Sequence, residues 1–239
     1  MFKRLVCGIL CLLIVAVVSL CGATESTFIS DIVSASKAEE PFCIIIDAGH
    51  GGFDGGAVAH DGTVEKELNL KIALKLDAVL RASGYKTVLV RSDDSSTNDP
   101  TDGEKAKVSD IKNRVKLMSK HKNSIFVSIH MNKYSTTQPH GAQVFYSKTD
   151  GSKELASMLQ ASVANHVQTD NKRVIKPSPK DIYLLNHAAV PAVIVECGFL
   201  SNPSDLENLK DDGYQLKIAT ALAYGIINYR KTEVKIGES

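Results

Sequence analysis

The sequence predicts an α/β fold: a single domain with a mostly parallel, twisted sheet of about six strands flanked by helices. Short apolar runs alternate with longer segments of helical period through the folded region. These apolar runs are continuous, which is typical of parallel strands covered on both faces. The chain has 239 residues, of which 44% are hydrophobic, so one domain can bury a stable core without disulfide or metal staples.

The predicted strands and helices follow one another in alternation. Continuous apolar runs predict strands at residues 42–47, 87–91, 124–130, 142–146, 181–185 and 191–196. Apolar residues at helical spacing predict helices at residues 64–84, 108–120, 152–167, 204–211 and 213–229. Polar residues dominate 92–106 and 169–180, so we expect loops there.

The first 23 residues have the pattern of an export signal. A positively charged start precedes an uncharged apolar run from Leu5 to Leu20, and small side chains follow at residues 21–23. We expect the protein to be exported, with cleavage before Thr24. The alternative is an uncleaved membrane anchor, although the apolar run is shorter than the roughly 20 residues of an average bilayer span.

The remaining chain divides into a polar linker at residues 24–41, one folded domain at 42–230 and a short tail at 231–239. Of the five cysteines, only Cys43 and Cys197 belong to the folded domain. An exported domain with so few cysteines does not depend on disulfides. Parallel strands would place these two thiols at opposite ends of the sheet, so we expect both to be free.

The charge balance argues against a nucleic acid as the main partner. Lys and Arg number 28 and Asp and Glu number 27, which gives a formal net charge of +1. Removal of a leader with Lys3 and Arg4 would change this charge to −1. A protein that binds a phosphate backbone normally carries a basic surplus.

Three polar residues lie at the ends of three predicted apolar strands. His50 follows the strand 42–47, His130 closes the strand 124–130 and Glu196 closes the strand 191–196. Open α/β sheets gather their ligands at the carboxyl ends of their strands. Two His and a carboxylate can bind a catalytic zinc ion and leave one position open for water.

Helical geometry adds Glu65 to this group. At about 100° per residue, Glu65 shares one helix face with Leu68, Ile72 and Leu76, while Glu67 points the opposite way. Glu65 is therefore the inward carboxylate at the start of a core-facing helix. Taken singly, each of these residues has an ordinary explanation, such as a hydrogen-bonded surface His or a Glu that complements a helix dipole. Their joint placement at one sheet edge favours a metal site.

Two other catalytic classes find little support. The Gly-rich segment at residues 49–56 lacks the Gly-Lys-Ser/Thr ending of a phosphate loop and the dinucleotide spacing. No Gly-x-Ser-x-Gly motif is present, and Cys197 has no basic neighbour in sequence. We read the glycines as permitting a tight backbone around a metal-bearing loop.

Four ordered segments resemble the motifs of the zinc-dependent N-acetylmuramoyl-L-alanine amidases, the Amidase_3 family. They are IIIDAGHGG, VEKELNL, FVSIHMN and AVIVECGFLSN, and the resemblance extends over residues 42–229. It implies one zinc ion per chain on His50, Glu65 and His130, with Glu196 as the catalytic carboxylate. It also implies the bond that is cut, the amide between the lactyl group of N-acetylmuramic acid and L-alanine in peptidoglycan.

Within the family, segments such as GAQVFY and CGFLSNPSD most resemble the germination-specific spore amidases. This implies a role in making muramic-δ-lactam in spore cortex together with a deacetylase, and an extracytoplasmic or spore intermembrane location. Asp47 and Asn132 are candidates for a supporting or substrate-binding role, because a carboxylate three residues from His50 could orient its imidazole. One departure from the family is Ala48, where many members have proline.

Two alternatives remain open at this point. One is a zinc peptidase that cuts the stem peptide of peptidoglycan, and the other is a non-catalytic wall-binding protein on the same fold. An accessory protein could aid metal loading, because three protein ligands around an open position need not hold zinc tightly.

Overall fold

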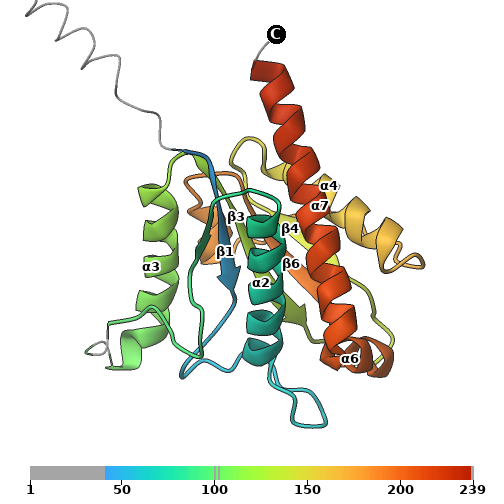
Figure 1. Ribbon diagram of the computed structural model, residues 1–239. Helices are drawn as coiled ribbons and strands as arrows, with labels where there is room; N and C mark the ends of the chain where they lie inside the picture. Colours follow the sequence, from blue (N-terminus) through green and yellow to red (C-terminus); the bar gives the residue numbers. More distant parts are fainter. Residues whose placement is uncertain (1–40, 100, 102, 238–239) are drawn as a thin grey trace, which may run out of the picture. The chain divides into compact units, whose positions relative to one another are not determined.

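The computed structural model describes residues 41–99, 101 and 103–237. They form an α/β domain around one six-stranded sheet with the strand order β2-β1-β3-β6-β4-β5 (Figure 1). The strands are β1 (Cys43–Ala48), β2 (Thr87–Leu89), β3 (Ser124–Asn132), β4 (Gln143–Tyr146), β5 (Lys176–Pro177) and β6 (Ala192–Phe199). Strands β2, β1, β3 and β6 are parallel, whereas β4 runs antiparallel to β6. The predicted fold class is confirmed.

Helices pack on both faces of the sheet. They are α2 (Glu65–Ala82), η1 (Gly103–Lys105), α3 (Ala106–Lys120), α4 (Ser152–His166), α5 (Tyr183–Asn186), α6 (Pro203–Lys210) and α7 (Asp212–Gly237). Helices α2, α4 and α7 contribute to the larger apolar cluster on one face, and α3 and α5 to the smaller cluster on the other. Figure 1 shows α2 and α7 side by side in front of the sheet.

The alternation of side chains along each strand explains why the strand sequences are continuously apolar. In β1, Ile44 and Ile46 belong to the larger cluster and Ile45 to the smaller one, and all three are fully buried. In β3, Val127 and Phe126 divide in the same way. Because helices cover both faces, neither side of these strands can carry solvated polar residues.

The register of the sheet determines which polar residues meet at its carboxyl edge. Asp47 at the end of β1 pairs with Ser128 of β3, and His130 of β3 pairs with Glu196 of β6. Paired residues on adjacent strands point to the same face. His130 and Glu196 therefore project on the face that carries α3 and α5, beyond the apolar cluster.

One predicted strand is wrong. Residues 181–185 do not join the sheet, because their apolar residues belong to the turn of helix α5. Tyr183 and His187 stack with ring centroids 3.8 Å apart, a contact that helical spacing makes possible. The Asn186 side chain also donates to the carbonyl oxygens of Pro179, Lys180 and Ile182, which closes the turn. The sixth strand is instead the two-residue β5, inside the segment expected to be a loop.

Several expectations concern residues near the ends of the chain. The expected leader and nearly all of the linker lie outside the described residues. Helix α7 continues to Gly237, beyond the predicted end at 229. Cys43 and Cys197 are both buried, and no disulfide joins the two. None of the helices in the described part is long and apolar enough to cross a membrane.

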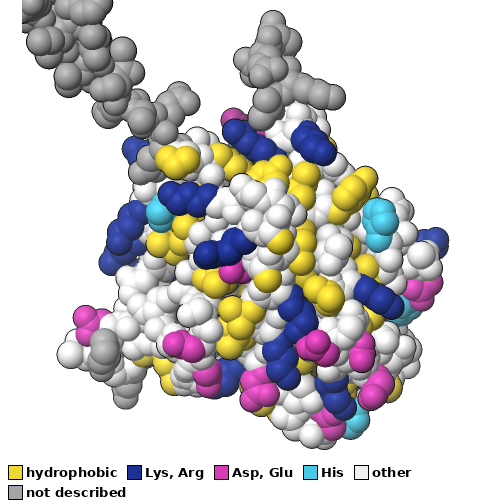
Figure 2. All heavy atoms as spheres, viewed as in Figure 1, with side chains coloured by type: hydrophobic (Ala, Val, Ile, Leu, Met, Phe, Trp, Pro, Cys, Tyr) yellow, Lys and Arg dark blue, Asp and Glu magenta, His cyan; other side chains and the backbone are white. Residues whose placement is uncertain are grey.

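The face that carries α2 and α7 shows Lys and Arg side chains interspersed with Asp and Glu (Figure 2). Lys75 of α2 pairs with Asp212 of α7 at 2.7 Å, and Lys210 pairs with Asp61 at 3.0 Å. Mixed charges of this kind do not create the single-sign field that attracts nucleic acid.

Packing of α2 on the sheet should make a large contribution to stability. Ile72 of α2 is fully buried, whereas Leu74 of the same helix is 37% exposed. We expect Ile72→Ala to lower the free energy of unfolding by about 2–5 kcal/mol, and Leu74→Ala by less than about 1 kcal/mol. Urea denaturation of both variants measures the difference, and equal losses would contradict this packing.

Candidate metal centre

The loop after β1 presents His50 in an unusual backbone conformation. His50 has φ = 61°, the one positive φ of a non-glycine residue in the part of the chain that the structure describes. Gly51 and Gly52 follow, also with positive φ, so the chain reverses sharply at the sheet edge. The Asp54 carboxylate lies 2.9 Å from Nδ1 of His50. This contact orients the ring so that Nε2 faces the site.

Two buried arginines hold the backbone of this loop. Arg91 donates to the carbonyl oxygens of Ala48 at 2.8 Å and Gly49 at 3.0 Å. Arg114 donates to the carbonyl oxygens of His50 at 2.7 Å and Ala48 at 3.2 Å. Both arginines are 3% exposed. Three successive carbonyl groups therefore have guanidinium donors, which keeps them satisfied while the loop turns back.

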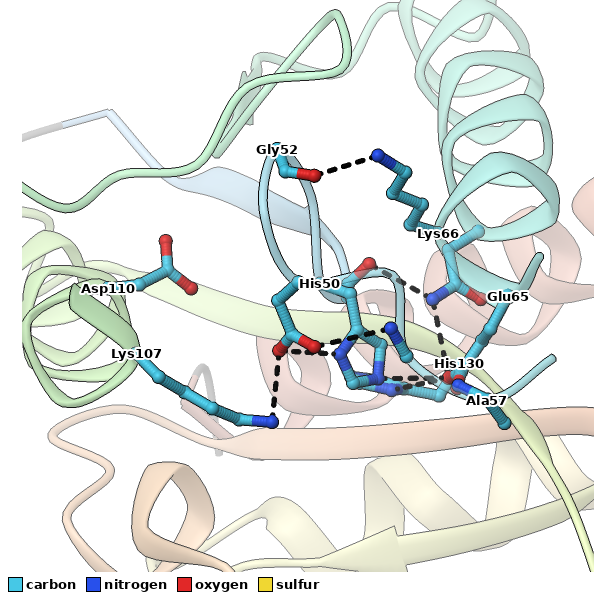
Figure 3. A network of polar contacts seen from close by, with 12 residues as sticks. His50, Gly52, Ala57, Glu65, Lys66, Lys107, Asp110 and His130 are labelled. Carbon is cyan, nitrogen blue, oxygen red and sulfur yellow. Dashed lines mark hydrogen bonds and ion pairs between the residues drawn. The ribbon is translucent and has the colours of Figure 1, made fainter. Parts of the chain in front are cut away.

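Glu65, the first residue of α2, lies between the two imidazoles (Figure 3). Its Oε1 is 3.2 Å from Nε2 of His50 and 3.0 Å from Nδ1 of His130. Main-chain N–H groups of Met131 and Ala57 donate to Oε1 and Oε2 at 3.1 and 2.8 Å. The carboxylate is thus held by two separate segments of the chain, the loop after β1 and the end of β3.

Electrostatics favour the anionic form of Glu65. Burial alone would raise the pKa of Glu65, but hydrogen bonds and charge from His130 and His50 outweigh it and hold that pKa well below its usual range. Burial likewise opposes a positive charge on His50, yet Glu65 and Asp54 raise the pKa of His50 overall. Negative charge from Glu65 and Asp54 therefore favours a positive charge on the His50 ring.

His130 occupies space that a side chain at residue 49 would fill. A Cβ atom on Gly49 would lie 2.2 Å from the imidazole ring of His130. Glycine is thus required here so that the β1 loop and the end of β3 can approach closely. The rings of His50 and His130 then meet edge to face, with centroids 5.0 Å apart.

The donor set and its spacing fit a zinc ion. His50, Glu65 and His130 each offer one ligand atom, and these three atoms lie within 4.8 Å of one another. Ligands of a tetrahedral zinc ion at about 2.0–2.2 Å lie about 3.3 Å apart, close to the 3.0 and 3.2 Å separations from Glu65 Oε1. Two nitrogens and one oxygen also leave a fourth position for water.

Glu196 lies beside this set as the register partner of His130. Its Oε2 is buried and has no hydrogen-bond partner among residues 41–99, 101 and 103–237. Burial raises the pKa of Glu196 to about 7; the charge of His130 opposes this rise and the negative charge of Glu65 adds to it. A buried carboxyl without a protein partner is costly for stability and typical of a group kept for chemistry.

The two supporting candidates from the sequence lie elsewhere in the network. Asp47 is buried and binds Arg114 and Ser128 rather than an imidazole. It acts on His50 only through Arg114. Asn132 pairs with Phe199 in the sheet, and its carbonyl oxygen accepts from the Leu200 N–H at 2.8 Å.

Sequence reasoning missed Asp54, Arg91 and Arg114. Arg114 had a detectable signal, because it lies on the same helix face as the apolar residues Ile111, Val115 and Met118, and an arginine there must find buried partners. Asp54 carried a weaker signal, an acidic residue four positions after His50. Nothing in the sequence indicated that Arg91 turns back to the loop.

The raised pKa of Glu196 should make the stability of the folded protein depend on pH. Above an ordinary pKa near 4.5, the unfolded chain has released this proton while the folded protein retains it up to about pH 7. The folded state therefore loses stability as pH rises through this window. In the presence of a chelator, we compare the free energy of unfolding of Glu196→Gln with that of the parent protein. We expect this difference to shift in favour of the variant by about 2 kcal/mol between pH 5 and pH 8. Urea denaturation at both pH values gives the difference, and a pH-independent effect would contradict the assignment.

Comparison with known proteins places this site in a family. The model of Amidase_3, N-acetylmuramoyl-L-alanine amidase, matches residues 44–228. The germination-specific N-acetylmuramoyl-L-alanine amidase of Bacillus subtilis is 31% identical over 189 residues, covering 78% of each chain.

Solved structures agree with this match. The CwlD amidase from Clostridioides difficile, solved in complex with the GerS lipoprotein, is 41% identical with a TM-score of 0.76, covering 80% of this chain and 98% of that one. An N-acetylmuramoyl-L-alanine amidase from Clostridium difficile 630 is 29% identical with a TM-score of 0.70, covering 81% and 98%. With its fold and nearly all of its folded residues matched, the chain belongs to the Amidase_3 family of N-acetylmuramoyl-L-alanine amidases.

Proposed function

We propose that the protein is a zinc-dependent hydrolase of the amide between the lactyl group of N-acetylmuramic acid and L-alanine in peptidoglycan. His50, Glu65 and His130 would hold one zinc ion, and Glu196 would be the catalytic acid and base. The observation that carries this proposal is the buried, unpartnered Oε2 of Glu196 on the sheet face where the three ligands converge.

Each residue has a distinct part in this chemistry. Zinc bound here would supply a Lewis acid that polarises the scissile carbonyl and lowers the pKa of water. Glu196 would accept a proton from the attacking water and return it to the departing alanine nitrogen. A pKa of Glu196 near 7 in the metal-free protein suits such an exchange, and a neighbouring dication would lower that pKa further. Asp54 would keep His50 turned toward the metal.

The biological setting we propose is spore cortex peptidoglycan. The supporting observations are the matches to the germination-specific amidase of Bacillus subtilis and to CwlD. In this setting the protein is exported and acts with a deacetylase to form muramic-δ-lactam. Because CwlD was solved in complex with the GerS lipoprotein, we also propose that an accessory protein supports the metal site of this chain.

Two substitutions should separate metal binding from catalysis. We expect the parent protein to contain about one zinc ion per chain, His130→Ala to lose it, and Glu196→Gln to keep it while hydrolysis falls at least about 100-fold. Elemental analysis and the release of peptides with an L-alanine amino terminus measure the two properties. Cleavage within the stem peptide would indicate a peptidase, and unchanged cell-wall effects of Glu196→Gln would indicate a wall-binding protein.

Asp54 offers a test of how the ligand is oriented. We expect Asp54→Asn to weaken zinc affinity by about 10- to 100-fold, because the carboxylate at 2.9 Å holds the His50 ring and increases its basicity. Asp61→Asn is the matched control, since Asp61 binds Thr63 and Lys210 instead. Competition with a chelator gives both affinities, and equal values for the two variants would show that Asp54 has no such role.

A further inference from the structure

We propose that Arg173 binds a free carboxylate of the peptide, on the residue that follows L-alanine, and so makes that carboxylate a determinant of substrate choice. This inference rests on the proposed function, because it assigns a specificity residue to the same site. It is carried by the position of Arg173, by the way its guanidinium is held and by the donors that the protein leaves unused.

Arg173 contacts the residue that pairs with Glu196 in the sheet. Its Nη1 donates to Oε1 of Gln143 at 3.2 Å, and Gln143 of β4 is the register partner of Glu196 in β6. The two partners project on the same face of the sheet, with backbones about 4.8 Å apart. The guanidinium therefore lies beside Gln143, whose strand β4 is next to that of Glu196 and lies on the side away from His130 in β3.

A bulge in β6 brings Phe199 to the same face of the sheet. His130 pairs with Glu196 but Asn132 pairs with Phe199, so β6 contains one extra residue at this point. The insertion turns Phe199 to the same face as Glu196. The guanidinium of Arg173 lies over the Phe199 ring at 4.5 Å from its centroid, which fixes its plane.

The guanidinium is held before any ligand arrives. Its Nε donates to the carbonyl oxygen of His140 at 2.7 Å. The main-chain N–H of Arg173 donates to Oδ1 of Asn171 at 2.9 Å. The amide of Gln143 is itself fixed by donation to the Val174 carbonyl oxygen at 2.8 Å. A side chain restrained in this way loses little entropy on binding.

Most of the donors of this guanidinium remain available. An arginine carries five N–H groups, and among the described residues only His140 and Gln143 accept from them. Within the part that the structure describes, Arg173 forms no ion pair with an acidic residue, whereas Arg81, Arg114 and Arg230 each do. A half-buried guanidinium with unused donors is suited to an anion supplied by the substrate.

The chemistry of the substrate identifies that anion. The sugar side of the scissile amide is neutral, while the peptide side carries carboxylates. One residue spans about 3.5 Å, so L-alanine and the residue after it together span about 7 Å, more than the spacing of about 4.8 Å between β6 and the neighbouring strand whose Gln143 binds Arg173. A planar guanidinium recognises a carboxylate with two parallel hydrogen bonds. The proposed ligand is therefore an acidic residue that follows L-alanine and whose carboxylate is not amidated.

Two substrates that differ by one group test the inference. They are N-acetylmuramoyl-L-alanyl-D-isoglutamic acid and its isoglutamine analogue, in which the carboxylate is an amide. We expect the parent protein to prefer the acid by about 10- to 100-fold in kcat/KM. Arg173→Met should reduce that ratio to about one, and Arg173→Lys should give an intermediate ratio. Lys172→Met, an exposed neighbour, is the matched control and should keep the full ratio.

Binding supplies a readout that does not depend on hydrolysis. Calorimetry on full-length Glu196→Gln and on its Arg173→Met double variant compares the dipeptides L-alanyl-D-isoglutamic acid and L-alanyl-D-isoglutamine. We expect tighter binding of the acid only where Arg173 is present. Equal binding of the two dipeptides in both proteins, or an equal loss for both substrates in Arg173→Met, would overturn the role of Arg173. Selective dipeptide binding without any hydrolysis would instead refute the proposed function.

Discussion

The carboxylate of Glu65 is the interaction on which the rest of the site depends. It contacts the loop after β1, the end of β3 and both imidazoles, at distances of 2.8–3.2 Å. Its burial is tolerated because each oxygen accepts a main-chain N–H and Oε1 also faces two histidines that favour the charged form. Helix α2 packs on the sheet through its apolar face, and the same packing brings its first residue to the metal position.

The structure places stability and chemistry in different residues. Arg91 and Arg114 are buried charges with many partners, and they stabilise a loop whose backbone would otherwise not turn back at His50. Glu196 is the opposite case, because its buried Oε2 has no hydrogen-bond partner among the residues that the structure describes. Removing an arginine would leave several buried carbonyl groups unsatisfied, whereas neutralising Glu196 relieves a cost. Such a cost is expected where a group is reserved for a substrate.

The sequence was sufficient to predict the sheet and the set of residues that converge at its edge. Continuous apolar runs identified the parallel strands, and helical periodicity predicted that Glu65 faces the core. Both predictions succeeded because the regular spacing of strands and helices leaves a pattern of buried residues in the sequence. The failures have a different origin. Within the predicted strand 181–185, the chain instead begins helix α5 (Tyr183–Asn186), supported by local contacts such as Tyr183 with His187, which an apolar run does not reveal. The contacts of Arg91 and Asp54 depend on loop geometry, and loops carry no periodic signal.

The most direct test of the central claim is anomalous diffraction at the zinc absorption edge, from crystals of the full-length protein grown with zinc. We expect one peak per chain, about 2.0–2.2 Å from a nitrogen of His50, a nitrogen of His130 and an oxygen of Glu65. Glu196 should lie outside this ligand set with its carboxyl facing the open position. A peak at other residues, direct ligation by Glu196, or no peak at saturating zinc would contradict the assignment.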